Sequence, residues 1–551
     1  MEWGLLRGLQ GRSELYWHRA LKADVYTVDP KVGNDADVRL CKQWLQICLR
    51  EHKNCNGMHS GGFVPTRLVD VGSSNSSEVR LRHTVGLDLK DPRYLALSHC
   101  WGLTMPPSAT TTSATLPERL RSIPLANLAR TFLDCITIAR NLDIQYIWID
   151  SLCILQDSRS DWEQEAAQMA SVYSNAYCTI SASGSSDGNG ECHVDENSRA
   201  YGPVTLSWNN MDQKIRTFSL FGESILNVLI NDPLTQRAWT LQERELSPRV
   251  LHYSHDAVRW ECRSLKASST FPWEDSSAFN GALRAFDVGQ IAGVTAHELD
   301  QEQREKNETA WFDTVFKYSG RALTKHSDRL PAISGIARAV QIVSDDTYLA
   351  GLWRSNLLHC LLWTSAWYDS KGLISHTRPE SFLAPSWSWA SVAGQVKYET
   401  WIFDALHPAP DTRLLPTILE ASTTPVGFDA FGQCKGGAIR LKGRLKPAMT
   451  LGEGFARQDR EGLYNLAADV ETPVKVENIR WDVPSEAPAG RIQGLICLCA
   501  AIRKEKHGDT VGLAIVPVAG EGSPEFRRVS LVYMLLVSWW EKSVELEVTI
   551  V

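Results

Sequence analysis

Three short apolar runs, separated by two segments of helical period, constrain the fold of this 551-residue chain most strongly. The runs are residues 94–98 (YLALS), 146–149 (YIWI) and 177–181 (YCTIS). Such runs are typical of strands that are buried on both faces of a parallel sheet. Residues 125–142 and 160–176 repeat apolar side chains every three to four positions, as amphipathic helices do. Alternation of strands and helices predicts an α/β core with a parallel sheet.

The segments on either side of this core predict a chain of four parts. Residues 1–90 should hold an N-terminal helix and short strands, and residues 91–265 the α/β core. Residues 266–385 have a mainly helical pattern. From 386 to 551, short strand-like runs between Gly and Pro predict a β-rich C-terminal domain. Several domains are expected, because the chain is too long for one ordinary core.

Charge and composition exclude several functional classes. With 57 Lys and Arg against 64 Asp and Glu, the net charge of −7 offers no global field to attract nucleic acid. The longest apolar stretch, residues 529–540, is shorter than the roughly 20 residues that a membrane span needs. The first residues lack the apolar core of a signal peptide. Thirteen cysteines without a repeated spacing indicate reduced thiols. We therefore expect a cytoplasmic protein with no nucleic-acid partner and no membrane span.

Polar side chains stand where two of the predicted strands end. Ser98 closes the first strand and Asp150 follows the second, so both should lie at the carboxyl edge of the sheet. Asp150 could bind a ligand hydroxyl, or it could cap the next turn through the backbone amides of Leu152 and Cys153. The pattern favours the capping role, and the two roles are compatible.

Glu165 stands on or beside the buried face of the predicted helix over 160–176. A glutamate held there would be partly desolvated and suited to acid–base or electrostatic work. The alternative is an acid on the helix surface, paired with Gln168 or Arg159. Position alone favours the surface alternative.

Arg237, Gln242 and Glu243 share one predicted short helix with Trp239. Arg237 and Glu243 could contact a ligand or bridge to the acids of the sheet. We favour a structural ion pair between Arg237 and either Asp150 or Asp157.

Two sets of cysteines and histidines suggest other chemistry. His99, Cys100 and Cys153 suggest a cysteine nucleophile, but adjacent residues of a strand point to opposite sides, which disfavours it. A second set has loosely zinc-like spacing: Cys41, Cys48, His52 and Cys55. Zinc sites usually draw paired ligands from two elements, and this set lacks that form. We therefore favour core packing there and name no metal ligand, and zinc binding by Cys48, His52 and Cys55 stays open as the alternative.

Three segments occur in fixed order: LALSHCWG at 95–102, YIWIDSLCILQD at 146–157 and RAWTLQE at 237–243. Together they resemble the heterokaryon incompatibility (HET) domain of filamentous fungi over roughly residues 91–245. Two positions depart from the family pattern. His99 stands where the family has tyrosine, and Leu155 where it commonly has asparagine.

The resemblance implies a role in fungal nonself recognition, in which the HET domain induces programmed cell death after incompatible fusion. HET domains are thought to be distantly similar to TIR domains, which implies a flavodoxin-like parallel sheet. Some TIR domains hydrolyse NAD through a glutamate in a Trp-Cys-x-x-Glu setting. Here Trp162-Glu-Gln-Glu165 supplies the tryptophan and the glutamate but not the cysteine. On this basis NAD is a candidate substrate, and no cofactor or metal is required.

The resemblance and the strand-end positions together give a set of candidate site residues. Glu165 and Asp150 are the candidate catalytic residues. The candidate ligand-binding residues are Ser98, Trp101, Asp157, Trp162, Arg237 and Glu243.

Two functions other than NAD hydrolysis remain open as alternatives. The chain could signal without catalysis, by self-association or by assembly with a partner incompatibility protein. It could also be an accessory enzyme of a secondary-metabolite pathway, with an apolar pocket for a small metabolite.

Overall fold

The computed structural model divides the chain into two compact units, Met1–Gly293 and Val294–Val551. Each unit is described by itself, over the described residues only. These are 34–56, 63–86, 91–102, 106–190, 192, 204–209, 215–220, 232–269, 301–366, 368–369, 372–373, 376–398, 413–414, 416–450, 464–468, 474–483, 495–502, 509–518, 525–536, 540 and 543–551.

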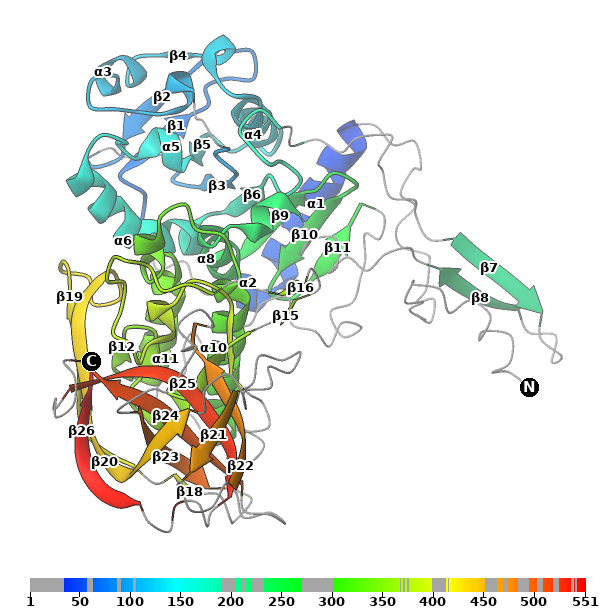
Figure 1. Cartoon of the computed structure of the whole chain (residues 1–551). Helices are drawn as coiled ribbons and strands as arrows, with labels where there is room; N and C mark the ends of the chain where they lie inside the picture. Colours follow the sequence, from blue (N-terminus) through cyan, green and yellow to red (C-terminus); the bar gives the residue numbers. More distant parts are fainter. Residues whose placement is uncertain are drawn as a thin grey trace. The chain divides into compact units, whose positions relative to one another are not determined.

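A nine-stranded mixed sheet forms the centre of the first unit (Figure 1). Its strands follow in the spatial order β11 (Lys266–Ser268), β10 (Val258–Cys262), β9 (Arg249–Tyr253), β6 (Cys178–Ser181), β3 (Tyr94–Ser98), β5 (Tyr146–Trp148), β1 (Arg67–Asp70), β2 (Glu78–His83) and β4 (Ile123–Pro124). β9, β6, β3 and β5 run parallel to their neighbours within this group. The flanking strands pair antiparallel.

The predicted α/β core is confirmed, and the three apolar runs form β3, β5 and β6. All residues of β3 and β6 are buried, as continuous apolar strands in a covered sheet should be. Numbered along the chain, the parallel strands lie in the order second, first, third, fourth. The sheet is mixed and not wholly parallel, because hairpins extend it on both sides, β1–β2 beyond β5 and β9–β10 beyond β6.

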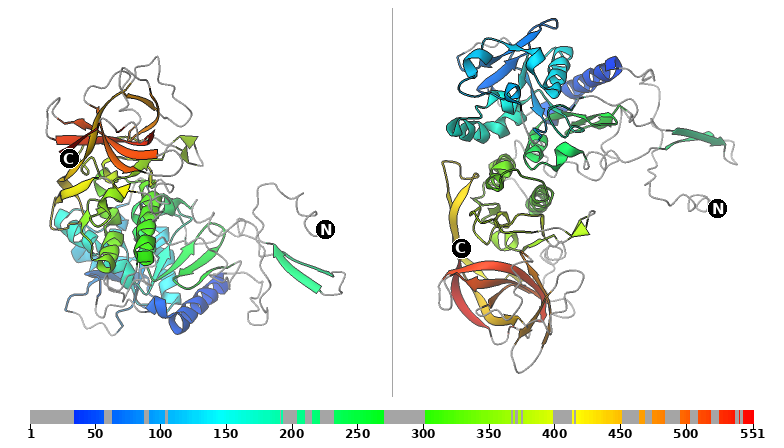
Figure 2. Two further views of the ribbon diagram at one scale, coloured as in Figure 1. Left: turned by 90° about the horizontal axis from the view of Figure 1, so that it is seen from below. Right: turned by 45° about the horizontal axis from the view of Figure 1, so that its top comes forward.

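The helices of the first unit fill the connections between these strands. They are α1 (Asn34–Glu51), α2 (Lys53–Asn56), α3 (Leu116–Arg119), α4 (Arg130–Asn141), α5 (Asp150–Cys153), α6 (Arg159–Asn175) and α8 (Trp239–Leu246). α1 packs against β10 (Figure 2). Trp44 of α1 and Trp260 of β10 stack there, with 6.3 Å between their ring centroids. α6 and α8 pack against each other. β7 (Val204–Asn209) and β8 (Ile215–Leu220) form a separate hairpin.

Ser160 and Glu163 have the Ser-x-x-Glu spacing of a capping box, but α6 begins earlier than such a box would place it. Ser158 is the N-cap, and its side chain accepts a hydrogen bond from the Asp161 amide at 3.3 Å. Ser158 and Asp161 have the spacing of a capping pair two residues earlier, and that pair leaves the Asp161 carboxylate free to bind elsewhere.

The second unit begins with two longer helices, α10 (Gln301–Ser319) and α11 (Ser334–Ser344). The short helix α12 (Leu357–Cys360) and the short strands β12 (Tyr348–Leu349), β13 (Leu352–Trp353), β14 (Trp363–Ser365), β15 (Tyr368–Asp369), β16 (Gly372–Leu373) and β17 (Val396–Tyr398) follow. Helix therefore dominates 301–344, whereas hairpins dominate the described residues from 348 to 373. The predicted four-part division stays a prediction.

The β-rich C-terminal region is confirmed as a strongly curved nine-stranded sheet (Figure 2). It contains β18 (Arg413–Leu414), β19 (Thr417–Pro425), β20 (Cys434–Thr450), β21 (Tyr464–Ala468), β22 (Val474–Trp481), β23 (Leu495–Ile502), β24 (Asp509–Pro517), β25 (Glu525–Leu536) and β26 (Val544–Ile550). Arg528 of β25 and Asp482 form a fully buried ion pair at 3.1 Å. The Arg528 guanidinium also lies over the Trp363 ring, which ties the sheet to β14. Among the described residues, every helix is too short or too polar to cross a membrane.

Candidate functional site

A buried carboxyl group meets the end of the central strand. Glu243 of α8 is only 6% exposed, and it accepts a hydrogen bond from the Ser98 hydroxyl at the end of β3. The Tyr173 phenol also contacts this carboxyl. Burial, aided by the negative charge of Asp150, raises the pKa of Glu243 to about 7, against the opposing effects of Ser98 and Arg237. Glu243 therefore changes charge near neutral pH.

Asp150 and Trp101 lie beside this carboxyl group at the same edge. Asp150 follows β5, which is the parallel neighbour of β3. The Trp101 indole Nε1 donates to Asp150 Oδ2 at 2.9 Å, and Trp101 itself is only partly buried. Two carboxyl groups and an accessible aromatic ring therefore share one end of the parallel strands, which is where ligands bind in open α/β sheets.

The side chain of Asp150 does not cap the following turn as expected. The amides of Leu152 and Cys153 bond to the carbonyl of Ile149, at 3.1 and 2.7 Å. Of the three backbone amides of this turn, only that of the adjacent Ser151 donates to Asp150 Oδ1, at 2.7 Å. The tight turn after β5 satisfies its own amides, so most of the Asp150 carboxylate faces Trp101 and His99.

His99 is a buried and neutral histidine at the base of the site. Its side chain is 1% exposed, and Nδ1 lies 3.7 Å from Asp150 Oδ1. Burial lowers the pKa of His99 against the attraction of Asp150, so the ring is neutral at pH 7. Neither ring nitrogen has a hydrogen-bond partner among the described residues.

Arg237 supports the strand end rather than forming the expected ion pair with Asp150 or Asp157. Its Nη1 donates to the His99 carbonyl oxygen at 2.6 Å, and its positive charge lowers the pKa of Glu243. Asp157 is exposed and accepts from the Ser113 amide at 2.8 Å and the Ser113 hydroxyl at 3.1 Å. Arg237 therefore joins the Ser98–Glu243 group, whereas Asp157 orders the loop around Ser113.

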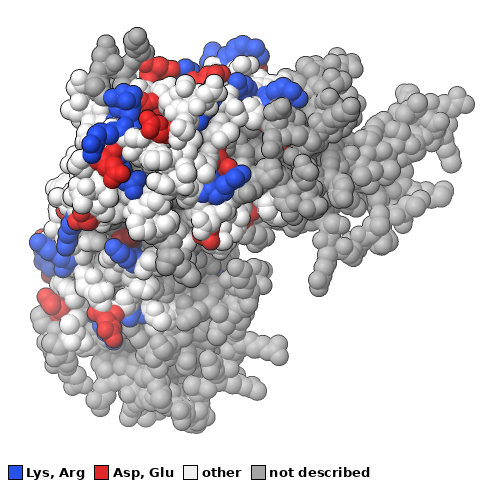
Figure 3. Space-filling model, turned by 90° about the horizontal axis from the view of Figure 1, so that it is seen from above, with Lys and Arg blue, Asp and Glu red and all other residues white. Residues whose placement is uncertain are grey.

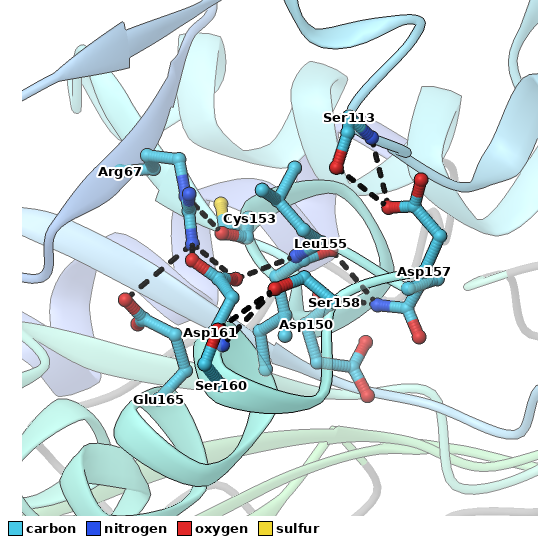
Figure 4. Close-up of polar contacts among 12 residues, drawn as sticks. Arg67, Ser113, Asp150, Cys153, Leu155, Asp157, Ser158, Ser160, Asp161 and Glu165 are labelled. Atoms are coloured by element: carbon cyan, nitrogen blue, oxygen red, sulfur yellow. Dashed lines mark hydrogen bonds and ion pairs between the residues drawn. The ribbon is translucent and has the colours of Figure 1, made fainter.

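Glu165 belongs to a different cluster, around Arg67 of β1 (Figure 4). It is 2% exposed, and its Oε1 lies 3.5 Å from Arg67 Nη2. The same guanidinium nitrogen binds both oxygens of Asp161, at 2.6 and 2.7 Å, and Arg67 Nε donates to the Cys153 carbonyl. Burial raises the pKa of Glu165. The surface pairing with Gln168 or Arg159 is wrong, because Glu165 turns inward to Arg67, and Arg159 pairs with Glu163.

The remaining candidate on α6, Trp162, is half-buried. Ser98, Trp101, Asp150, Arg237 and Glu243 are therefore brought together, while Glu165 and Asp157 are placed in other contacts. Tyr173, which also contributes to the site, had no sequence signal of its own. Figure 3 shows acidic and basic side chains interspersed over the described part of one face, in line with the nearly balanced composition.

The thiols near the site are unsuited to nucleophilic work. Burial raises the pKa of Cys100, and it raises the pKa of Cys153 to about 12. Both are therefore protonated at neutral pH, whereas a reactive cysteine needs its thiolate.

Gly102 shapes the loop that carries Trp101. Its φ of 74° lies in the left-handed region, and an added Cβ would stand 2.7 Å from Cβ of Asp187. We expect Gly102→Ala to lower the free energy of unfolding by about 1–3 kcal/mol and to displace Trp101 from Asp150. Urea unfolding and tryptophan fluorescence check this expectation. Unchanged values for both would contradict it.

The raised pKa of Glu243 predicts a pH dependence of stability. Between pH 4.5, the ordinary value, and about 7 the folded chain holds a proton that the unfolded chain has lost. The free energy of unfolding should therefore fall as pH rises through this window, by on the order of 3 kcal/mol at most. Glu243→Gln should remove this contribution. Urea unfolding of wild type and variant, repeated at several pH values in this window, tests the prediction. The same dependence of the free energy of unfolding on pH in both proteins would refute it.

The third signature segment differs from α6 in the spacing between its tryptophan and its glutamate. In Trp-Cys-x-x-Glu, three residues separate tryptophan and glutamate. Trp239 and Glu243 have this separation, whereas only two residues lie between Trp162 and Glu165. The glutamate with the matching spacing is thus the one that lies at the strand ends.

Comparison with known proteins gives one family. No curated protein and no solved structure gives a significant match to the chain. Residues 94–243 match the family model described as heterokaryon incompatibility protein (HET), and this span runs from the start of β3 to Glu243. The resemblance of the three signature segments is confirmed, and the chain carries a HET domain at residues 94–243.

Proposed function

We propose that this protein acts in heterokaryon incompatibility by hydrolysing NAD at the carboxyl ends of β3 and β5, with Glu243 as the catalytic carboxylate. One observation carries the proposal. Glu243 is a buried acid with a pKa of about 7, held by Ser98 beside Asp150 and Trp101. Perturbed carboxyl groups of this kind gather at functional sites.

The topology and the motif spacing support the same position. The order second, first, third, fourth of the parallel strands is the one with which a flavodoxin-like sheet begins, and its ligand lies where the chain reverses direction across the sheet. That point falls between β3 and β6, so the feature it shares with the proposed site is the end of β3, where Ser98 bonds to Glu243. Trp239 and Glu243 reproduce the tryptophan–glutamate spacing of NAD-hydrolysing TIR domains. Both features support Glu243, in place of Glu165, as the hydrolytic residue of this proposal.

The proposed reaction needs no metal or redox partner. The bond between the ribose carbon and the pyridinium nitrogen breaks, and nicotinamide leaves with the electron pair. The Glu243 carboxylate stabilises the positive charge that develops on the ribose. Water then adds to the ribose carbon and releases one proton. Trp101 offers an aromatic face for a ring of the substrate, and Asp150 adds negative charge beside the sugar.

In this proposal, loss of NAD after incompatible fusion causes cell death in the cytoplasm. Self-association or a partner incompatibility protein would bring the chain into its active state. The alternative of non-enzymatic assembly predicts death without loss of NAD.

The proposal can be tested by induced expression in a fungal host. We expect wild-type expression to lower cellular NAD before viability falls, and Glu243→Gln to leave both unchanged at equal protein level. Death that persists with Glu243→Gln while NAD stays constant would overturn the hydrolase proposal in favour of signalling by assembly.

A further inference from the structure

Four potential metal ligands from two distant parts of the sequence meet in the first unit. Cys48 and His52 lie one helical turn apart at the end of α1 and just beyond it, and Cys55 lies in α2. The fourth, Cys262, is the last residue of β10, and it lies 210 positions from His52 in the chain. Their ligand atoms all lie within 4.8 Å of one another.

The separations suit a tetrahedral ion. Ligand atoms at about 2.0–2.3 Å from a central zinc ion stand roughly 3.3–3.8 Å apart. Cys262 Sγ and His52 Nδ1 are separated by 3.4 Å. The three cysteines are buried and the histidine is partly buried, so the group is nearly closed to solvent. Closed four-ligand sets of cysteine and histidine are typical of structural zinc sites.

Surrounding donors suit three thiolates. Arg249 of β9 donates from Nε to Cys48 Sγ at 3.2 Å, and its Nη2 donates to the Cys55 carbonyl at 3.1 Å. The Leu265 amide donates to Cys262 Sγ at 3.2 Å. Three thiolates and one divalent ion leave a net charge of about −1, which the Arg249 guanidinium would balance. Such outer partners orient metal ligands and stabilise their charge.

Hydrogen bonds of Asn56 also fix the turn between α1 and α2, which carries three of the four ligands. The side-chain Nδ2 of Asn56 donates to the backbone carbonyls of Leu49 and His52, at 2.9 and 3.2 Å. Arg249 in turn donates to the Asn56 side-chain oxygen. These bonds hold the chain between α1 and α2 in the turn that aims Cys48, His52 and Cys55 at Cys262.

We propose that Cys48, His52, Cys55 and Cys262 form a structural zinc site that fastens α1 and α2 to the β9–β10 end of the sheet. Binding displaces the thiol protons, and no ligand position is left for a substrate. The sequence pattern favoured core packing over zinc because the fourth ligand, Cys262, lies in a distant hairpin. Cys41, which shared the sequence pattern, stands apart from the cluster and interacts with Tyr253.

Elemental analysis of the full-length protein tests the proposal. We expect about one zinc ion per chain after extensive dialysis. Cys262→Ala should lose it, whereas the matched control Cys41→Ala, which removes a buried cysteine of α1 outside the cluster, should keep it. Chain that lacks zinc even after incubation with excess zinc sulfate would overturn the proposal, as would equal loss from both variants.

A second measurement does not depend on the variants folding. Replacement of zinc by Co²⁺ in the wild-type chain should give the intense visible bands of tetrahedral cobalt and the ultraviolet bands of thiolate-to-cobalt charge transfer. Intact mass without reductant should also show all three thiols free after metal removal. An octahedral cobalt spectrum, or a disulfide among Cys48, Cys55 and Cys262, would refute the site.

Discussion

Glu243→Gln is expected to lower the rate of nicotinamide release by at least about 100-fold, because it removes the negative charge that would stabilise the developing cation. Glutamine has nearly the same shape and keeps an oxygen that can accept from Ser98. The change should therefore act on the reaction far more than on the fold. Nicotinamide released from NAD by purified wild-type and variant protein, measured by chromatography, gives the two rates.

Glu165→Gln is the matched control for this experiment. Both glutamates are buried and both have a raised pKa, but Glu165 faces Arg67 and not the strand ends. We expect the Glu165 variant to keep its rate within about tenfold of wild type, if its fold is intact by circular dichroism. The reverse order of effects would move the catalytic role back to Glu165.

Arg67→Met should lower the free energy of unfolding of the first unit by about 3–5 kcal/mol. Arg67 is 4% exposed, and it is the cation that faces Asp161 and Glu165. Methionine fills much of the same space but leaves two acids, one of them deeply buried, without this charge. Urea unfolding followed by a probe in the first unit checks the value, since the two units need not unfold together.

A triple variant separates charge from packing in this cluster. Adding Asp161→Asn and Glu165→Gln to Arg67→Met removes the uncompensated negative charges. It should recover a large part of the lost stability, because neutral amides are less costly to bury than carboxylates. No recovery would mean that Arg67 acts through its contact with the Cys153 carbonyl and through packing.

The parallel core could be predicted because its signals are local. The apolar runs of β3 and β6 are long enough to be strands and too continuous to be half exposed. The apolar period of α6 also places Met169 and Tyr173 on its buried face. The position of Asp150 after β5 likewise placed it at the sheet edge with Ser98. Apolar runs, helical period and the position of a residue after a strand depend only on neighbouring residues, so one sequence is enough to predict them.

The contacts that decide the site depend on distant residues. Nothing near Glu165 indicates that Arg67, 98 positions earlier, will face it. The same holds for Cys262 and His52. Strand pairing also decides whether a flanking strand runs parallel, so the sequence of β1 gave no sign that this strand joins β5 antiparallel. Ser98 and Glu243 meet only because α8 packs on α6 over the end of β3.

The pH dependence of nicotinamide release by the full-length protein tests most directly whether Glu243 works as the ionised group at this site. We expect release to rise about tenfold per pH unit at low pH and to level off above the Glu243 pKa of about 7, because only the carboxylate stabilises the cation. Release that is independent of pH between about 5.5 and 8.5, or no release at any pH, would contradict this assignment.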